Sequence, residues 1–176
     1  MSLLGYVLVC TDSCAAGVKA IHLAKASDID TTVGTEGFTA GATGIFTAVT
    51  MNRVEVFKTY DYQDFTAEFR EAPTPNANGC GYSVQQEIEF TIPCWTVAGR
   101  NAIAELEANS CCGLVALVEF TDGTVVAAGY LARNHFKLTS APFATGKALT
   151  DSQSWVITLT AQTTEHAKSF TGTIPL

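Results

Sequence analysis

The sequence is poor in charge and contains no long hydrophobic run. Only 15% of its 176 residues are Asp, Glu, Lys or Arg, against about 25% in typical globular domains. No apolar stretch approaches the roughly 20 residues of a membrane-spanning helix. Acidic residues outnumber basic ones by 17 to 10, so the basic surface that nucleic-acid binding requires is missing. These absences argue against membrane insertion by this chain and against specific DNA binding. The low charge fraction favours a surface buried in an assembly, with a merely Thr/Ala/Gly-rich surface as the alternative.

Patterns for catalysis and metal binding are also missing. The six cysteines include no C-x-x-C pair, and no His/Cys cluster has zinc spacing. The favoured interpretation is a set of small buried thiols, with a Cys10–Cys14 disulfide as the alternative. The three histidines lie in unrelated contexts, and no serine has the surroundings of a nucleophile. The sequence therefore predicts no enzyme, no cofactor and no metal site.

The residues that are present predict β-structure in a single domain over 1–176. Leu3–Cys10 is expected to be a strand and not a secretion signal, because no Lys or Arg precedes it. Tyr82–Ile92 alternates apolar and polar residues, which is typical of a half-buried strand. Two apolar runs flank Asp122-Gly123, a strong hairpin signal, and Ser154–Gln162 alternates again.

One segment has the pattern of an α-helix. Thr96–Asn109 can begin with Thr96 as its N-cap and places several apolar residues near one face. About eight or nine short strands surround it, with turn signals every eight to twelve residues. The expected fold is mainly β: an antiparallel β-sandwich or partly closed barrel with one flanking α-helix.

Acidic residues gather on one face of the clearest strand. Glu87 and Glu89 share the polar face of Tyr82–Ile92, and Glu55 and Glu68 are expected on neighbouring strands. A pair of carboxylates facing one way is the minimum for glycosidase-like acid/base chemistry. The aromatic residues that sugar stacking requires are few, however, so a solvated acidic face is the favoured interpretation.

The segment 27–44 is rich in glycine and threonine and poor in apolar residues. This composition is unsuited to a core element and predicts a flexible hairpin arm. Val33 and Phe38 are expected on its two limbs. The residues assigned to this arm are Val33, Gly34, Gly37, Phe38 and Gly41.

Three stretches, in order along the chain, resemble one protein family. The first is Gly17-Val-Lys-Ala-Ile-His-Leu-Ala24 followed by Asp28-Ile-Asp, and the second is Asn78-Gly79 before Tyr82-Ser-Val-Gln-Gln-Glu-Ile-Glu-Phe90. The closing stretch comprises Gly129-Tyr130, Gly146-Lys147-Ala148 and Asp151-Ser-Gln-Ser-Trp-Val-Ile-Thr-Leu159. Together they resemble the tail tube proteins of tailed bacteriophages, particularly those of phages and prophages of Bacteroidetes-like hosts.

The resemblance implies a structural virion protein, assembled in the host cytoplasm and located in the tail. Copies would form hexameric rings that stack into a tube and contact other tail proteins, and DNA would pass through the tube without specific binding. Glu87, Glu89, Glu55 and Glu68 would then face the lumen, and the 27–44 arm would contribute to ring stacking. The alternatives are a tail terminator or neck ring, the tube of a contractile injection system, and a ligand-binding β-sandwich.

Overall fold

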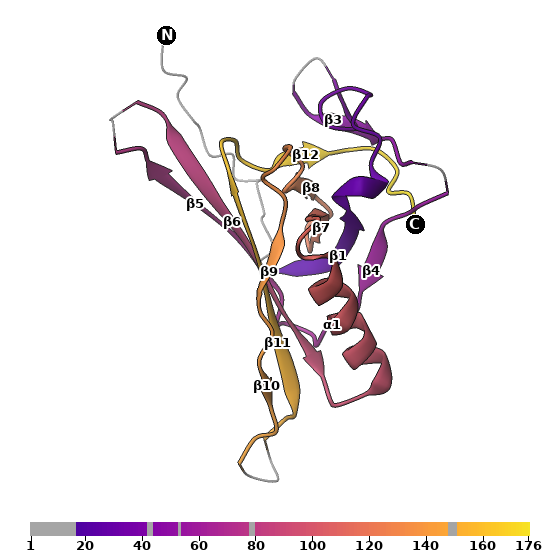
Figure 1. Cartoon of the computed structure of the whole chain (residues 1–176), viewed down its shortest axis with the longest axis vertical. Helices are drawn as coiled ribbons and strands as arrows, with labels where there is room; N and C mark the ends of the chain where they lie inside the picture. Colours follow the sequence, from indigo (N-terminus) through magenta and orange to yellow (C-terminus); the bar gives the residue numbers. More distant parts are fainter. Residues whose placement is uncertain (1–16, 42–43, 53, 78–79, 148–150) are drawn as a thin grey trace.

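The computed structural model describes residues 17–41, 44–52, 54–77, 80–147 and 151–176. Within these ranges two β-sheets pack face to face, and the helix α1 (Val97–Asn109) lies beside them (Figure 1). The fold is therefore mainly β with one flanking helix, as the alternating patterns predict. The strand expected at Leu3–Cys10, and Cys10 and Cys14 themselves, lie outside the described residues. No helix in the described ranges is both long and apolar enough to cross a bilayer.

The described part of the larger sheet has seven strands, and all neighbours are antiparallel except β12 and β3. In spatial order these strands are β2 (Phe38–Ala40), β3 (Phe46–Val49), β12 (Lys168–Phe170), β8 (Val125–Ala128), β7 (Leu114–Phe120), β1 (Val18–Lys25) and β4 (Lys58–Tyr60). A 3-10 turn, Ala26–Asp28, follows β1.

The smaller sheet has five described strands, and β11 is at its centre. In spatial order they are β10 (Phe143–Ala144), β11 (Ser154–Thr163), β6 (Tyr82–Pro93) and β5 (Glu68–Pro75), and β9 (Lys137–Ser140) also pairs with β11. Figure 1 shows β5 and β6 running out together beyond the rest of the molecule.

Local sequence chemistry explains the β7–β8 hairpin. Gly123 has a φ of 86°, which a side chain would disfavour. The Asp122 carboxylate accepts a hydrogen bond from the backbone N–H of Thr124 at 2.8 Å, and the N–H of Gly123 bonds the carbonyl of Phe120 at 2.9 Å. The hairpin predicted from Asp122-Gly123 is confirmed.

The main core lies between the two sheets and α1. The alternate residues Ile88, Phe90 and Ile92 of β6 point into it, and so do Ile157 and Leu159 of β11. The further buried contributors come from β1, β7 and α1: Ile21, Leu23, Leu114, Ala116, Val118, Ile103 and Leu106. The period-two patterns of β6 and β11 therefore identify the sheet face that is buried.

Thr96 caps the helix as predicted, because its Oγ1 accepts a hydrogen bond from the Gly99 N–H at 3.0 Å. We expect Thr96→Ala to lower the free energy of unfolding by about 1 kcal/mol, since an N–H of the first turn loses its partner. Urea denaturation of both proteins measures the difference. The exposed Thr164 gives a matched control, and Thr164→Ala should change stability by less than about 0.5 kcal/mol. Equal effects of the two substitutions would contradict the capping role.

Candidate assembly surface

The outward face of β5 and β6 carries a cluster of three glutamates around one arginine. Arg70 is on β5, and its side chain contacts two glutamates of β6. Its Nη2 is 2.6 Å from Glu87 Oε1 and 3.4 Å from Glu89 Oε2. Its Nε is 3.8 Å from Glu68 Oε2. The strand register places these residues together, because Glu68 is opposite Glu89 and Arg70 is opposite Glu87. The cluster is thus acidic, with three carboxylates and one guanidinium.

These ion pairs contribute little to stability. The Arg70 side chain is 49% exposed and its partners between 25% and 57% exposed, and exposed pairs are worth roughly 0–1 kcal/mol. The cluster therefore matters mainly for the charge that this face presents. The polar face continues on β11 and β9, where the hydroxyls of Thr160 and Thr139 are 2.6 Å apart.

Glu55 does not join this cluster. The segment from Ile45 to Tyr62 contains two strands, β3 and β4, that are not neighbours in the sheet. β3 pairs with β2 and β12, whereas β4 pairs with β1 at the opposite edge of the larger sheet. Glu55 is exposed in the connection between them. The expectation that it lies on a strand beside Glu87 is therefore incorrect.

The 27–44 segment also differs from the expected arm. Phe38 is 0% exposed and belongs to a second core cluster with Phe46, Tyr130 and Phe170. Its ring centroid lies 4.9 Å from that of Phe46 and 5.8 Å from that of Tyr130. The prediction that this segment adds nothing to a core is therefore wrong at Phe38.

Three of the remaining arm residues, Val33, Gly34 and Gly37, lie in the turn that precedes β2. Val33 is 38% exposed, and Gly34 and Gly37 have φ angles of 61° and 85°. A Cβ on Gly34 would lie 2.2 Å from the Phe38 carbonyl oxygen, so the backbone passes too closely for a side chain. Gly41 follows β2, and its N–H donates to the carbonyl of Ile45. In this stretch the glycines serve a tight turn.

The smaller sheet ends in two edges without a further strand among the described residues. One edge is β5, and the other is formed by β9 and β10 on β11. Pro73 and Pro75 lie in the outer half of β5. Proline cannot donate a hydrogen bond and is tolerated at open edges, where it discourages strand addition. The proximal half of β5, Glu68–Glu71, contains no proline.

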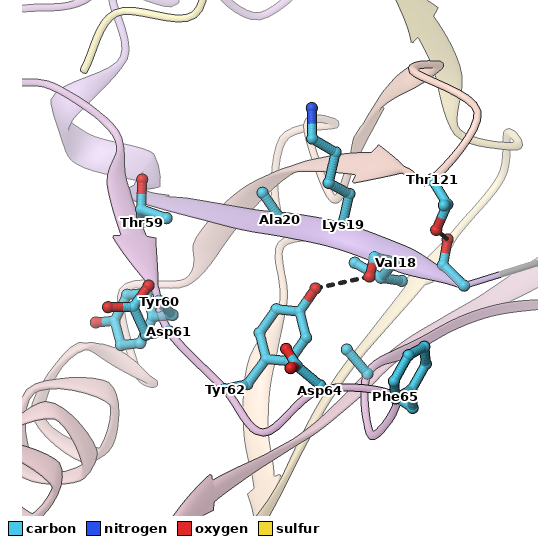
Figure 2. Close-up of a pocket in the computed structure, with 12 residues that line it drawn as sticks. Val18, Lys19, Ala20, Thr59, Tyr60, Asp61, Tyr62, Asp64, Phe65 and Thr121 are labelled. Carbon is cyan, nitrogen blue, oxygen red and sulfur yellow. Dashed lines mark hydrogen bonds between the residues drawn. The ribbon is translucent and has the colours of Figure 1, made fainter.

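A surface cavity of about 640 Å³ lies where the start of β1 separates from the chain that follows β4 (Figure 2). The Tyr62 hydroxyl donates to the Val18 carbonyl at 2.8 Å across this gap. Phe65 at the rim is fully exposed and has a φ of 61°. Asp61 and Asp64 give the wall acidic character. The sequence patterns do not indicate this cavity, because its two walls are distant along the chain.

The structure also gathers an aromatic cluster that the patterns miss. Trp155 has its ring centroid 5.1 Å from that of Trp95 and 4.8 Å from that of Phe143. The Arg100 guanidinium lies 5.9 Å from the Trp155 ring. Trp95 is 58% exposed. Trp155 Nε1 is buried and has no hydrogen-bond partner among the described residues. The cluster forms one end of the smaller sheet.

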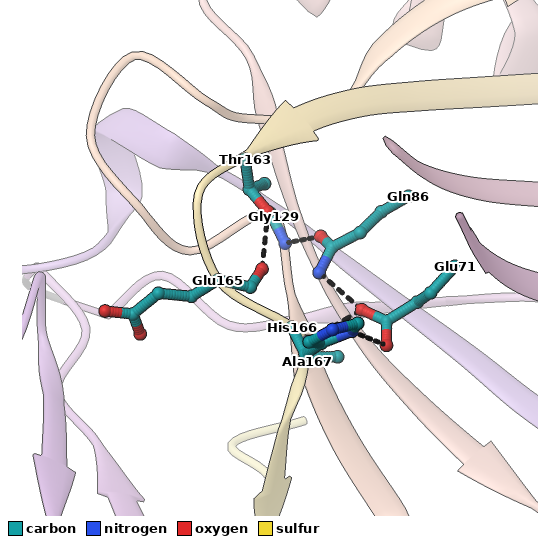
Figure 3. Close-up of polar contacts among 7 residues, drawn as sticks. All are labelled: Glu71, Gln86, Gly129, Thr163, Glu165, His166 and Ala167. Atoms are coloured by element: carbon teal, nitrogen blue, oxygen red, sulfur yellow. Dashed lines mark hydrogen bonds and ion pairs between the residues drawn. The ribbon is translucent and has the colours of Figure 1, made fainter. Parts of the chain in front are cut away.

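A polar network around the buried Gln86 connects the two sheets (Figure 3). Gln86 on β6 is 1% exposed. Its Nε2 donates to Glu71 Oε1 at 2.8 Å, and its Oε1 accepts from the Gly129 N–H at 3.0 Å. Glu71 also accepts from the Ala167 N–H at 2.7 Å and lies 3.1 Å from His166 Nδ1. The network joins β5 and β6 to the end of β8 and to the β11–β12 connection.

Tyr130 adds a second polar link beside this network. Its hydroxyl donates to Glu165 Oε2 at 3.0 Å, and Lys168 Nζ lies 2.7 Å from the same oxygen. The hydrogen bonds from Lys168 and Tyr130 lower the pKa of Glu165. Burial, with the Glu165 bond as a smaller cause, raises the pKa of Tyr130. Both groups therefore keep their charge states near neutral pH, which preserves the link.

The three histidines have separate local surroundings in the described ranges. His22 is buried on β1 with Nδ1 2.9 Å from Thr59 Oγ1, and burial lowers its pKa. His135 Nδ1 lies 2.8 Å from the Gly129 carbonyl, and His166 faces Glu71. Each histidine thus has a local hydrogen-bond partner, in a different part of the fold.

Comparison with protein-family models, with curated proteins and with solved structures finds no match for this chain.

Proposed function

We propose that this chain is a structural subunit of a bacteriophage tail tube. Copies would close into rings, hexameric by the family resemblance, and the rings would stack into a channel for genome delivery in the virion tail. Assembly would take place in the host cytoplasm. One observation carries the proposal: the smaller sheet buries one face in the core, exposes a polar outer face, and ends in two open edges.

The outer face suits the wall of a water-filled channel. It bears three carboxylates, two hydroxyls, one amide and one guanidinium on adjacent strands, at the positions Glu68, Arg70, Gln85, Glu87, Glu89, Thr158 and Thr160. Phosphate attraction to cations is the main source of non-specific DNA affinity. A net acidic wall therefore allows DNA to pass without binding.

The two edges suit ring closure. The proximal half of β5 in one copy would pair with the β9–β10 edge of the next, which would extend the smaller sheet around the ring. Rotational symmetry would limit this pairing, so that the exposed edges would be used without open-ended growth. The prolines at the outer half of β5 would restrict the pairing to Glu68–Glu71.

Electron microscopy of the purified full chain tests the proposal. We expect rings at moderate concentration and stacked tubes at high concentration. A protein that remains monomeric by light scattering at every concentration would contradict it. Single rings that never stack would instead support the alternative of a terminator or neck ring.

Charge reversal on the outer face should change how tubes interact with DNA. We expect tubes of the Glu87→Lys/Glu89→Lys variant to retain short DNA at low salt, whereas native tubes release it. The double variant Glu87→Gln/Glu89→Gln is the control: it removes the same ion pairs but adds no cation. Retention is measured by co-sedimentation of labelled DNA with the tubes.

The outcome depends on where these residues lie in the assembly. Both variants should assemble like the native chain, since exposed pairs contribute at most about 1 kcal/mol each. DNA retention by the lysine variant should fall steeply as salt is raised. Equal release of DNA by the lysine and glutamine tubes would place this face away from the channel.

The aromatic cluster favours one second candidate, a ligand-binding β-sandwich. Trp95, Phe143 and Trp155 converge at one sheet end, and Trp95 is the exposed member that a ligand could contact. Trp95→Ala would abolish ligand binding at that end. Because Trp95 packs against Phe143 of β10, which also lies on the proposed ring edge, ring formation by this variant is checked by electron microscopy.

A further inference from the structure

The strongest unassigned feature is a pair of adjacent thiols at the end of α1. The expectation of buried thiols is wrong for the four described cysteines, Cys80, Cys94, Cys111 and Cys112, which are all exposed. The Sγ atoms of Cys111 and Cys112 lie 3.7 Å apart. Cys111 Sγ also lies 3.8 Å from the Ala108 carbonyl oxygen. The turn is fixed by its backbone, since the N–H groups of Cys112 and Gly113 both donate to the Asn109 carbonyl at 3.1 Å.

Packing holds this turn in place. Gly113 has a φ of 87°, and a Cβ there would lie 2.5 Å from His135 Cβ. Its carbonyl accepts a hydrogen bond from the Ala26 N–H at 3.1 Å. The backbone that carries the two thiols is therefore anchored to the 3-10 turn after β1 and to the segment before β9. A fixed backbone reduces the entropy lost when both side chains engage one ligand.

The thiols are poorly placed for a disulfide with each other. Adjacent Cα atoms across a trans peptide are about 3.8 Å apart, whereas disulfides usually need about 4.4–6.8 Å. Their separation does match tetrahedral metal coordination. Two sulfur ligands at about 2.3 Å from one tetrahedral ion lie about 3.8 Å from each other, close to the observed 3.7 Å.

We propose that Cys111 and Cys112 form a two-thiolate binding site for a soft divalent cation of the zinc or cadmium type. Thiolate ligands select such ions over harder ones. On binding, each thiol loses its proton to solvent and two sulfur–metal bonds replace two metal–water bonds, with no change of oxidation state. Among the described residues no group of three or more His, Cys, Asp or Glu is placed to hold a metal. The ion would therefore keep solvent ligands in its other two positions.

Local electrostatics favour the bound state over free thiolates. The carbonyl end of a helix carries partial negative charge, which disfavours free thiolates and favours a cation. A divalent cation neutralises both thiolates. Affinity should consequently rise with pH, because two protons leave for each ion bound.

Titration of the reduced full chain with Cd²⁺ tests this site, with thiolate-to-cadmium charge-transfer absorption as the readout. We expect one tight ion per chain, and at least a tenfold loss of affinity in Cys111→Ser and in Cys112→Ser. Cys80→Ser and Cys94→Ser are matched controls, since both of these thiols are also free and exposed. These two controls should bind like the native chain, and circular dichroism should show all four variants folded.

Three results would overturn the site. The first is equal affinity in the native chain and in both Cys111→Ser and Cys112→Ser. The second is loss of binding in Cys80→Ser or Cys94→Ser, or in a Cys10→Ser/Cys14→Ser double variant, with Cys111→Ser unaffected. The third is an affinity that does not change with pH. None of these results bears on ring or tube formation, so the test is independent of the proposed function.

Discussion

Replacing Phe38 with alanine is expected to lower the free energy of unfolding by about 3–5 kcal/mol, the range for emptying a buried aromatic site. Phe38 is fully buried against Phe46, Tyr130 and Phe170. Truncation would remove its ring contacts and leave a cavity at the edge of the larger sheet. Thermal and urea unfolding, followed by circular dichroism, measure the loss.

Phe65 provides the matched control. It is the same residue type, but it is fully exposed in the β4–β5 connection. Phe65→Ala should therefore change stability by less than about 0.5 kcal/mol. A loss below about 1 kcal/mol for Phe38→Ala would mean that the β2–β3 hairpin detaches readily, as the flexible-arm hypothesis requires. A large loss would mean that deleting this hairpin removes part of the fold together with any role in stacking.

The contrast between β6 and the 27–44 segment shows what a sequence pattern can predict. Ile88, Phe90 and Ile92 repeat at period two, so the local pattern alone identifies their buried face. Phe38 has no such neighbours, and its burial comes from Phe46, Tyr130 and Phe170 in three other segments. A single aromatic residue in a glycine-rich segment gives no periodic signal, so composition is misleading there.

The acidic face was partly predictable for a similar reason. Glu87 and Glu89 share a face because of alternation within one strand, and β5 pairs with β6 through a short connection that brings Glu68 close. Glu55 was misplaced because the chain from β3 to β4 crosses to the opposite edge of the sheet. Strand order is set by packing between distant segments, and local alternation carries no information about it. For the same reason, the sequence pattern does not predict the partners of Gln86, a polar residue within the apolar face of β6.

Replacing Gln86 with leucine is expected to cost about 2–3 kcal/mol, although leucine is the more hydrophobic residue. The Gln86 amide satisfies the Gly129 N–H on one side and Glu71 on the other (Figure 3). Leucine can bond neither, so a buried N–H would lose its acceptor. An orphaned buried group costs about 1–3 kcal/mol, and the link between the two sheets would be lost as well.

The neighbouring Gln85 gives the matched control, because it lies on the exposed face of the same strand. Gln85→Leu should change the unfolding free energy by less than about 0.5 kcal/mol in the same urea titration. A loss that is equally small for Gln86→Leu would show that water or another group replaces the amide. The polar network would then contribute little to holding the sheets together.

A double-mutant cycle with Glu71→Ala, which removes the acceptor oxygens, separates the network from simple burial. Glu71 accepts hydrogen bonds from both Gln86 and the Ala167 N–H, so the two residues should be coupled by about 0.5–3 kcal/mol. Additive effects would mean that Gln86 acts through Gly129 alone. Strong coupling would mean that the β5–β6 hairpin and the β11–β12 connection form one cooperative unit. In that case the open edge of β5 would be held rigid by contacts remote from it, which would reduce the entropy lost when a neighbouring strand pairs with it.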